Sequence, residues 1–274
     1  MEYLIKGGID GIVVAGCTGA DATLDEEEQI DFVRHINENW GSKTTVIAGD
    51  GANVTYEAVD FARRMEDEAD VNLHLQVSPY KVKPSDAGII QHYEHVAESI
   101  QGEVILYSVP GRTGGKGVLP AVAKQLMQHP RIIGIKEASG DISRIQRAIQ
   151  LIGDDGFVIS GDDGLTLSTI MAGGTGVISV AANVAPELVK KSVDSVLRGD
   201  YTEADESGRA LAPLYSALFP KSDDGNPSPN PCALHYALNR MGINVGLPRL
   251  PLTDLEPAEK EGVDAALRSL KLIE

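Results

Sequence analysis

The sequence predicts an α/β protein: a (β/α)8 TIM barrel, incomplete at its N-terminus, followed by a C-terminal helical domain. Short apolar runs of strand length alternate with segments whose apolar residues recur at helical spacing. This alternation indicates parallel strands joined by right-handed crossovers. The repeat is regular, and no glycine fingerprint of the dinucleotide-binding type interrupts it, which favours a barrel over an open doubly wound sheet.

The strands are expected in the first two thirds of the chain, separated by helices such as the one that carries Ile30, Val33 and Ile36. Asp21 or Thr23 can cap that helix, since either side chain offers an oxygen to its unpaired amides. The expected strands are Gly11–Ala15, Thr44–Ala48, Asn72–Val77, Glu103–Ser108, Ile132–Lys136, Phe157–Ser160 and Gly176–Val180.

The chain opens in what resembles the end of a helix, ahead of the first expected strand at Gly11. An eight-stranded barrel would need one further strand before Met1. We therefore expect the first barrel strand to be missing and the region before Gly11 to pack irregularly. We also expect the strands beside the gap to be weakly ordered, because an unpaired strand edge lacks hydrogen-bond partners.

The pattern changes after Val180, where helices follow one another without strands between them. The expected helices are Pro186–Leu197, Tyr201–Leu218, Asn230–Met241 and Pro257–Leu270, with a proline- and glycine-rich loop at Lys221–Pro231. The first of these helices belongs to the barrel, and the others form an appendage. We therefore expect a β/α barrel over residues 1–200 and a helical domain over residues 201–274.

Composition excludes several classes of function. The 274 residues carry a net charge of -16, so no basic stripe is available to replace the counterions of a nucleic acid. No apolar stretch reaches the roughly 18 residues that suggest a membrane span. Cys17 and Cys232 do not make a disulfide framework, which fits a reducing, cytoplasmic setting. An anionic substrate would need a local cluster of positive charge on this acidic protein.

One lysine lies where a strand is otherwise apolar. The run Ile132–Glu137 has the pattern of a buried parallel strand, and Lys136 lies near its end. Burial of an isolated ammonium group costs several kcal/mol or drives the amine to its neutral form. A neutral amine in a dry pocket is the nucleophile of Schiff-base chemistry on ketones. The alternative is a lysine that reaches solvent or pairs with Glu137 or Asp162.

Other polar groups are expected at the carboxyl ends of the strands, where barrels of this kind carry their chemistry. The turn after the first expected strand holds Cys17 and Thr18 and offers amides and a hydroxyl to a carboxylate. Tyr107 lies near the end of another strand. Arg112 follows on the next turn, where a guanidinium suits bidentate binding of a carboxylate. A plain turn and a surface arginine are the alternative interpretations.

No metal site is expected from the sequence. His92 and His95 lie three residues apart on an expected helix, which is a possible spacing for a pair of ligands. No third ligand accompanies them, whereas a zinc site in a protein uses at least three protein ligands. We therefore expect the two histidines to lie on a solvated helix face.

Several motifs together resemble the pyruvate-dependent class I aldolases, the family that includes dihydrodipicolinate synthase and N-acetylneuraminate lyase. The motifs are Gly16–Gly19, Tyr107–Thr113, Gly134–Gly140, Ser160–Asp163 and Gly176–Val180. The resemblance runs from Gly7 to about Leu252. It implies a β/α barrel with a C-terminal helical domain that assembles as a homo-oligomer, either a dimer or a tetramer.

The resemblance also implies a role for each candidate residue. Lys136 would form an imine with pyruvate, so that no separate cofactor is needed, and Tyr107 would relay protons to and from this imine. Thr18 and the amides beside it would hold the pyruvate carboxylate, and the backbone of Ile178 would line the pocket. Arg112 would bind the carboxylate of aspartate semialdehyde, which points to the synthase branch and to lysine and diaminopimelate biosynthesis.

Two positions depart from the pattern of the synthases. Cys17 stands where their proton relay has a threonine, and Lys81 stands where a second tyrosine reaches across the dimer. A thiol is a poorer hydrogen-bond partner than a hydroxyl, and a charged Lys81 would disfavour protonation of its neighbours. Two alternatives therefore stay open. One is a pyruvate-releasing aldolase or dehydratase acting on a 2-keto-3-deoxy sugar acid or sialic acid, and the other is a catalytically impaired barrel that binds ligands.

Overall fold

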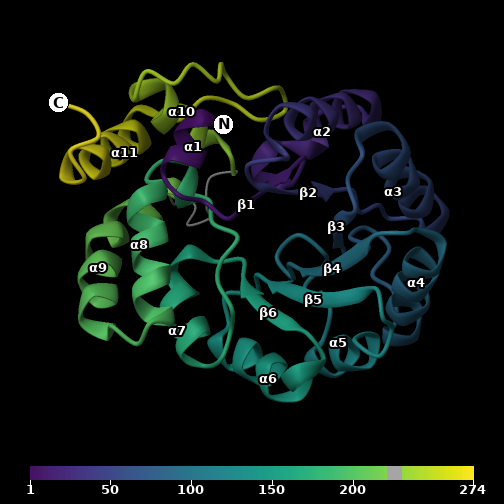
Figure 1. Ribbon diagram of the computed structural model, residues 1–274. Helices are drawn as coiled ribbons and strands as arrows, with labels where there is room; N and C mark the ends of the chain where they lie inside the picture. Colours follow the sequence, from purple (N-terminus) through teal and green to yellow (C-terminus); the bar gives the residue numbers. More distant parts are fainter. Residues whose placement is uncertain (221–229) are drawn as a thin grey trace. The chain divides into compact units, whose positions relative to one another are not determined.

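The computed structural model describes residues 1–220 and 230–274, so most of the expected loop Lys221–Pro231 lies outside the described residues. The chain forms two compact units, and each is described by itself (Figure 1). The sheet unit comprises Asp10–Gly16 and Asp25–Ile178. The helical unit comprises Met1–Ile9, Cys17–Leu24 and Ser179–Glu274. A domain boundary between residues 200 and 201 stays a prediction.

The sheet unit is a six-stranded parallel sheet in the order β1-β2-β3-β4-β5-β6, which confirms the predicted α/β class. Its strands are β1 (Gly11–Val14), β2 (Thr45–Gly49), β3 (Leu73–Val77), β4 (Glu103–Ser108), β5 (Ile132–Glu137) and β6 (Phe157–Ser160). Its helices are α2 (Glu26–Trp40), α3 (Thr55–Ala69), α4 (Asp86–Ser99), α5 (Pro120–Leu126), α6 (Ile142–Ile152) and α7 (Thr166–Met171). The first six expected strands therefore agree with the structure to within about one residue, inside the usual uncertainty of element ends.

The last expected strand, Gly176–Val180, is wrong as a strand. Val177 forms a single isolated bridge with Ser160, and the amide of Ile178 donates to the Ser160 carbonyl at 2.9 Å. Two further backbone hydrogen bonds accompany this bridge: the Thr175 amide donates to the Val158 carbonyl at 3.0 Å, and the Ser160 amide donates to the Gly176 carbonyl at 2.9 Å. β6 itself ends at Ser160. Closure into an eight-stranded barrel, and the absence of its first strand, stay predictions.

The first helix of the sheet unit begins later than predicted. Asp21 and Thr23 do not cap α2, because both belong to a separate 3-10 turn, Asp21–Thr23. Asp25 caps the helix instead: its side chain accepts from the Glu28 amide at 2.8 Å, and the Glu28 side chain accepts from the Asp25 amide at 3.1 Å. This capping box satisfies two amides at once.

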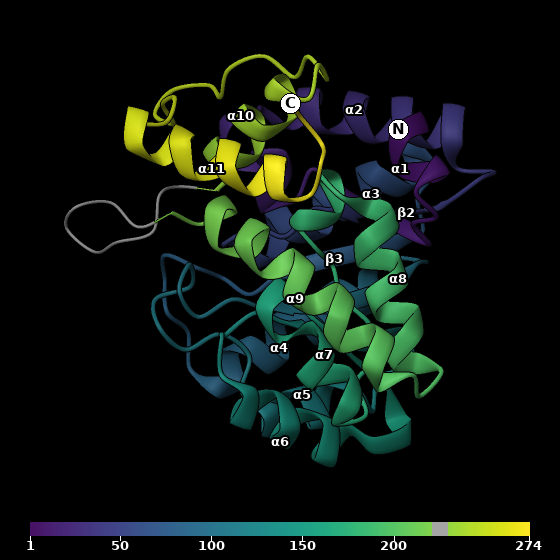
Figure 2. The same ribbon diagram turned by 90° about the vertical axis from the view of Figure 1, so that its left-hand side faces the viewer.

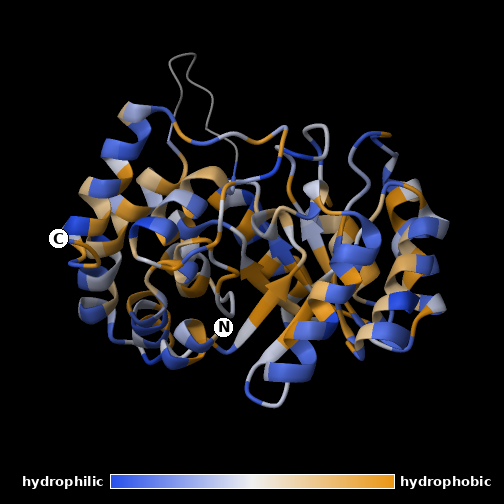
Figure 3. Cartoon of the chain, turned by 90° about the horizontal axis from the view of Figure 1, so that it is seen from above, coloured by the Kyte–Doolittle hydropathy of each residue, from blue (hydrophilic) through white to orange (hydrophobic). Residues whose placement is uncertain are grey.

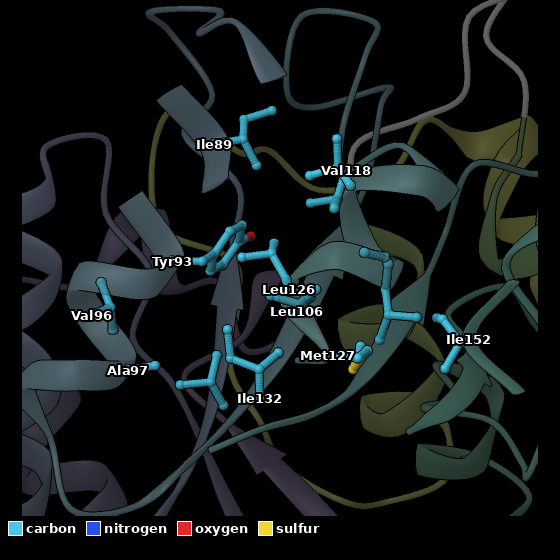
Figure 4. Close-up of a cluster of buried hydrophobic side chains, with 14 of the residues drawn as sticks. Ile89, Tyr93, Val96, Ala97, Leu106, Val118, Leu126, Met127, Ile132 and Ile152 are labelled. Atoms are coloured by element: carbon cyan, nitrogen blue, oxygen red, sulfur yellow. The ribbon is translucent and has the colours of Figure 1, made fainter. Parts of the chain in front are cut away.

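The main hydrophobic core of the sheet unit lies between one face of the strands and helices α3 to α6. Figure 4 shows Tyr93 of α4 and Leu126 of α5 close to Leu106 and Ile132 of the strands. These four side chains are at most 2% exposed. Burial of each aliphatic side chain stabilises the fold by about 1.5–3 kcal/mol before entropy is counted. The strands are accordingly the most hydrophobic segments in Figure 3.

The helical unit consists of α1 (Glu2–Lys6), α8 (Pro186–Leu197), α9 (Tyr201–Leu218), α10 (Cys232–Arg240) and α11 (Pro257–Ser269). Helices α8 and α9 run side by side and have the bounds that their apolar spacing predicts (Figure 2). The expectation of irregular packing before Gly11 is wrong for α1. This helix is tied to the unit by the Tyr3 hydroxyl, which donates to the Val184 carbonyl at 2.6 Å. In the described residues, no helix is long and apolar enough to cross a membrane.

Candidate active site at the ends of strands β4 and β5

The register of the sheet places Lys136 of β5 directly opposite Tyr107 of β4. Neighbouring residues of a strand point to opposite faces, so these two register partners share one face, and Ser108 and Glu137 share the other. The Lys136 Nζ lies 4.3 Å from the centre of the Tyr107 ring. Two residues that the sequence predicted separately as catalytic groups therefore lie together.

The surroundings of Lys136 leave room for its side chain. Tyr107 is 7% exposed, and Lys136 is half-buried. At Gly161, which follows β6, an added Cβ would lie 2.9 Å from Lys136 Cε and 2.6 Å from Ala138 Cβ. A side chain there would push the lysine aside, because real Cβ contacts are not that short. The sequence marked Gly161 as part of a motif and did not show this role.

Arg112 lies on the loop Val109–Leu119, which connects β4 to α5. The turn is held from inside by Thr113, which is 3% exposed and whose hydroxyl donates to the Val109 carbonyl at 3.1 Å. The Arg112 amide donates to the same carbonyl at 2.9 Å. Arg112 itself is exposed. The turn therefore has a fixed backbone and presents a guanidinium to solvent or to a ligand.

Lys81 lies on the loop between β3 and α4. The Asn53 side chain accepts hydrogen bonds from the amides of Tyr80 at 2.7 Å and Lys81 at 3.0 Å, which fixes the backbone there. Lys83, two residues on, adopts φ +46° and its side chain passes over Gly114 of the Arg112 loop. Gly114 has φ +74° and no Cβ, and both features are needed where another side chain crosses so closely.

The Arg112 loop is also tied to the start of α4 by an ion pair, in which Lys116 Nζ lies 2.7 Å from Asp86 Oδ1. The loop between β3 and α4 and the Arg112 loop together carry four cationic side chains on a chain of net charge -16: Lys81, Lys83, Arg112 and Lys116. Such a group is the local positive charge that an anionic substrate needs.

The remaining candidates are placed as follows. Cys17 and Thr18 belong to the helical unit, where they form a short 3-10 turn, Cys17–Gly19, and the Asn230 side chain donates to the Thr18 hydroxyl at 3.0 Å. Ile178 is the last residue of the sheet unit and is held by its amide bond to Ser160. The roles of Cys17, Thr18 and Ile178 stay predictions.

One histidine expected on a solvated face is buried. His92 of α4 is 4% exposed, lies 3.0 Å from the Thr55 hydroxyl through Nδ1, and packs edge-on to Tyr93. Burial, with a smaller contribution from His95, lowers the pKa of His92 to about 4. Among the described residues, no group of three or more metal-ligating side chains is found.

A buried ion pair between Glu137 and Arg144 lies on the sheet face opposite to Lys136, and the sequence did not reveal this pair. Glu137 is fully buried, and its carboxylate accepts from Arg144 Nε at 3.1 Å and from the Ser139 amide at 2.8 Å. Arg144 lies seven residues further on, in α6. The only sequence signal was a carboxylate inside an apolar strand, which requires a buried cation or donor.

Comparison with known proteins identifies the family. The family model described as "Dihydrodipicolinate synthetase family" matches residues 1–270. A 4-hydroxy-tetrahydrodipicolinate synthase of Archaeoglobus fulgidus is 42% identical over 273 residues, which cover 100% of this chain and 90% of that protein. A synthase of the same name from Pseudomonas aeruginosa is 39% identical over 268 residues, covering 98% and 89%.

Solved structures agree with this assignment. The chloride-inhibited dihydrodipicolinate synthase from Acinetobacter baumannii, complexed with pyruvate, superimposes with a TM-score of 0.93 at 34% identity, covering 99% of this chain and 90% of that chain. The synthase from Thermotoga maritima gives a TM-score of 0.93 at 33% identity, with the same coverage. The resemblance found in the sequence motifs and the prediction of an enzyme of this kind are confirmed: the chain belongs to the dihydrodipicolinate synthetase family.

Proposed function

We propose that this enzyme condenses pyruvate with aspartate semialdehyde through an imine on Lys136, the reaction of a 4-hydroxy-tetrahydrodipicolinate synthase. The observation that carries the proposal is the position of the Lys136 amine 4.3 Å from the Tyr107 ring, at the aligned ends of two strands. Relatives of that name, similar over the whole chain, support the same reaction.

The chemistry follows from an amine and a phenol on one face of the sheet. The Lys136 amine attacks the keto carbon of pyruvate, and water leaves as the imine forms. Loss of a proton from the methyl carbon gives an enamine, which attacks the aldehyde carbon of the second substrate, and the aldehyde oxygen takes up a proton. Attack of the substrate amine or of water on the resulting imine carbon then releases the product and frees the Lys136 amine. Tyr107 would relay protons in these steps. The covalent imine does the work that a separate cofactor would otherwise do.

The second substrate would be held by the loop that carries Arg112. Its guanidinium is exposed on a turn whose backbone is fixed, which suits a fork of two hydrogen bonds to a carboxylate. The neighbouring lysines of both loops would attract the anionic keto acid. Thr18, Cys17 and Ile178 keep the roles that the family resemblance implies: carboxylate binding, proton relay and pocket lining.

Borohydride trapping with pyruvate tests the imine directly. A mass increase on Lys136 is expected in the native enzyme and is lost in Lys136→Ala. The matched control is Lys124→Ala, since Lys124 is a partly exposed lysine of α5 that pairs with Asp155. Absence of any adduct, or an adduct on another lysine, would overturn the proposal and favour a ligand-binding barrel.

A second candidate function is favoured by Lys81, which occupies the place of a catalytic tyrosine in the synthases. A pyruvate-releasing aldolase or dehydratase on a 2-keto-3-deoxy sugar acid or sialic acid would use the same imine. Assay of pyruvate with aspartate semialdehyde, beside a panel of such sugar acids, separates the two reactions. Turnover of a sugar acid, with none of the semialdehyde, would replace the first function by the second.

We also propose a cytoplasmic homo-oligomer, either a dimer or a tetramer. Several large apolar side chains are exposed near Asn53, whose side chain accepts from the amides of Tyr80 and Lys81. Their exposed fractions are 39% at Val54, 69% at Tyr56, 42% at Tyr80 and 63% at Val82. Apolar surface of this kind is typical of a protein interface. One relative is described as a monomeric variant, so the assembly is best measured for this chain itself by sedimentation velocity.

A further inference from the structure

Three segments that carry the proposed catalytic and binding groups meet at one arginine of α6. Arg144 Nε donates to Glu137 Oε2 at 3.1 Å, next to Lys136 in β5. Arg144 Nη2 donates to the Ser108 hydroxyl at 3.0 Å, next to Tyr107 in β4. The same nitrogen donates to the Val118 carbonyl at 2.7 Å, at the far end of the loop that carries Arg112.

The acceptors around Arg144 are buried. Glu137 and Ser108 are fully buried, Val118 is also 0% exposed, and the Arg144 side chain is 16% exposed. The Ser108 hydroxyl closes the group, since it lies 3.4 Å from the Val118 carbonyl and accepts from the Val118 amide at 3.2 Å. We call Ser108, Glu137 and Arg144 the Arg144 cluster. It lies on the sheet face opposite to the one that bears Lys136 and Tyr107.

We propose that Arg144 is a positioning residue that holds the Arg112 loop in register with the ends of β4 and β5, so that the aldehyde substrate meets the enamine on Lys136. This inference rests on the proposed function. Ser108 follows Tyr107 and Glu137 follows Lys136, and both accept hydrogen bonds from the Arg144 guanidinium. The same guanidinium holds the Arg112 loop at the Val118 carbonyl. A shift of the loop by about 1 Å can cost on the order of a hundredfold in rate, because the reacting atoms must be aligned.

An arginine is required here because its donors lie in a fixed planar fork. Three acceptors from three segments are reached by the Nε and Nη2 groups together. A lysine ammonium is a compact charge and can balance Glu137 without spanning to Ser108 and Val118. The variant Arg144→Lys is therefore expected to keep the positive charge beside Glu137 and to lose the hydrogen bonds to Ser108 and Val118.

The test measures both substrates in Arg144→Lys. We expect the KM for aspartate semialdehyde to rise about tenfold while borohydride trapping of pyruvate and its KM stay within about twofold of the native enzyme. The matched control is Arg147→Lys, since Arg147 is an exposed arginine of the same helix that donates to Gln150 at 2.7 Å. Ser108→Ala removes one acceptor and keeps the charge pair, so a smaller rise of about threefold is expected.

Hydrogen exchange supplies a readout that does not depend on the reaction. Peptides covering residues 109–119 are expected to exchange faster in Arg144→Lys, whereas those of α6 and of the Arg147→Lys control keep native rates. Unchanged exchange in this loop, or an unchanged KM for the aldehyde, would overturn the inference. If Arg144→Lys instead loses pyruvate trapping, raises the KM for both substrates and lowers the yield of folded protein, the role of Arg144 is purely structural. Failure of the native enzyme to trap pyruvate would instead overturn the proposed function, with the exchange result still deciding the role of Arg144.

Discussion

The sheet carries a second buried ionic group on the face that packs against the helices, and this group is built differently from the Arg144 cluster. His74 and Gln76 of β3 point to the same side as each other and meet Asp50, which follows β2. His74 Nδ1 lies 2.5 Å from Asp50 Oδ2, and Gln76 donates to Asp50 Oδ1 at 2.6 Å. Glu66 of α3 lies 3.5 Å from His74 Nε2. We call Asp50, Glu66, His74 and Gln76 the His74 cluster.

The two clusters differ in the permanence of their charge. A guanidinium stays protonated at every pH at which proteins fold, so the positive charge of Arg144 is permanent. Burial lowers the pKa of His74, but the charges and hydrogen bonds of Asp50 and Glu66 together outweigh burial, and the net shift of this pKa is upward. Burial also raises the pKa of Asp50. The two clusters therefore differ in their cation, which is a permanent charge in the Arg144 cluster and a titratable imidazole in the His74 cluster.

The largest expected effect is the loss of Arg144 itself. Arg144→Met leaves the Glu137 carboxylate buried without its cation, and breaking such a pair costs about 3–5 kcal/mol of unfolding free energy. Urea denaturation at neutral pH measures this loss, with Arg147→Met as an exposed control that is expected to change little. A loss below about 1 kcal/mol would show that Glu137 tolerates isolation and would remove the contrast between the clusters.

Arg112→Ala sharpens the functional side of the comparison. Removal of a charged fork to the substrate carboxylate is expected to raise the KM for aspartate semialdehyde by about ten- to a hundredfold, with pyruvate trapping largely intact. Arg147→Ala, at an exposed arginine of α6 that lies outside both loops, is the control. An equal loss of trapping would mean that Arg112 supports the fold or the lysine.

His74→Leu tests whether the second cluster is the weaker one. We expect His74→Leu to lower the unfolding free energy by about 1–3 kcal/mol at neutral pH, because Asp50 stays buried without its histidine partner. Asp50 keeps the hydrogen bond from the Gln76 side chain. The loss is limited because Asp50, whose pKa is raised, can take up a proton. His95→Leu, at an exposed position of α4, should stay within about 0.5 kcal/mol of the native protein. A cost as large as that of Arg144→Met would contradict the ranking.

The smallest expected effect is a dependence of stability on pH. Because folding raises the pKa of His74, its contribution is fully present below the unfolded value of about 6.5 and is lost as the pH rises through the folded value. The raised pKa of Asp50 acts in the same direction. Unfolding free energy should therefore fall as the pH rises above about 6.5, by about 1.4 kcal/mol for each unit of pKa shift.

Asp50→Asn provides the control for this pH effect, since it removes the carboxylate that raises the pKa of His74. Glu66 and Tyr93 also face the cluster from α3 and α4, so the residual slope in Asp50→Asn reports their share. A native protein with a flat profile over this range, or a variant with an unchanged slope, would show that His74 is not the titrating group.

The sequence by itself determined the elements and most of the chemistry. Apolar periodicity is a local property, and it located the six strands and helices α8 and α9 almost to the residue. The lysine inside an apolar strand was visible because a charge in such a run is anomalous without any knowledge of its partners. Arg112 was visible as a guanidinium on the turn that follows the strand of Tyr107. The family resemblance rested on these same segments.

Only the tertiary structure decided which residues meet. The register that sets Tyr107 against Lys136 depends on pairing between strands, and a shift of one residue would turn either side chain to the other face. The pairing of Glu137 with Arg144, and of Asp50 with His74, depends on how α6 and the strands pack together. The same holds for the reduction of Gly176–Val180 to one bridge, since a strand exists only where a neighbour offers it hydrogen bonds.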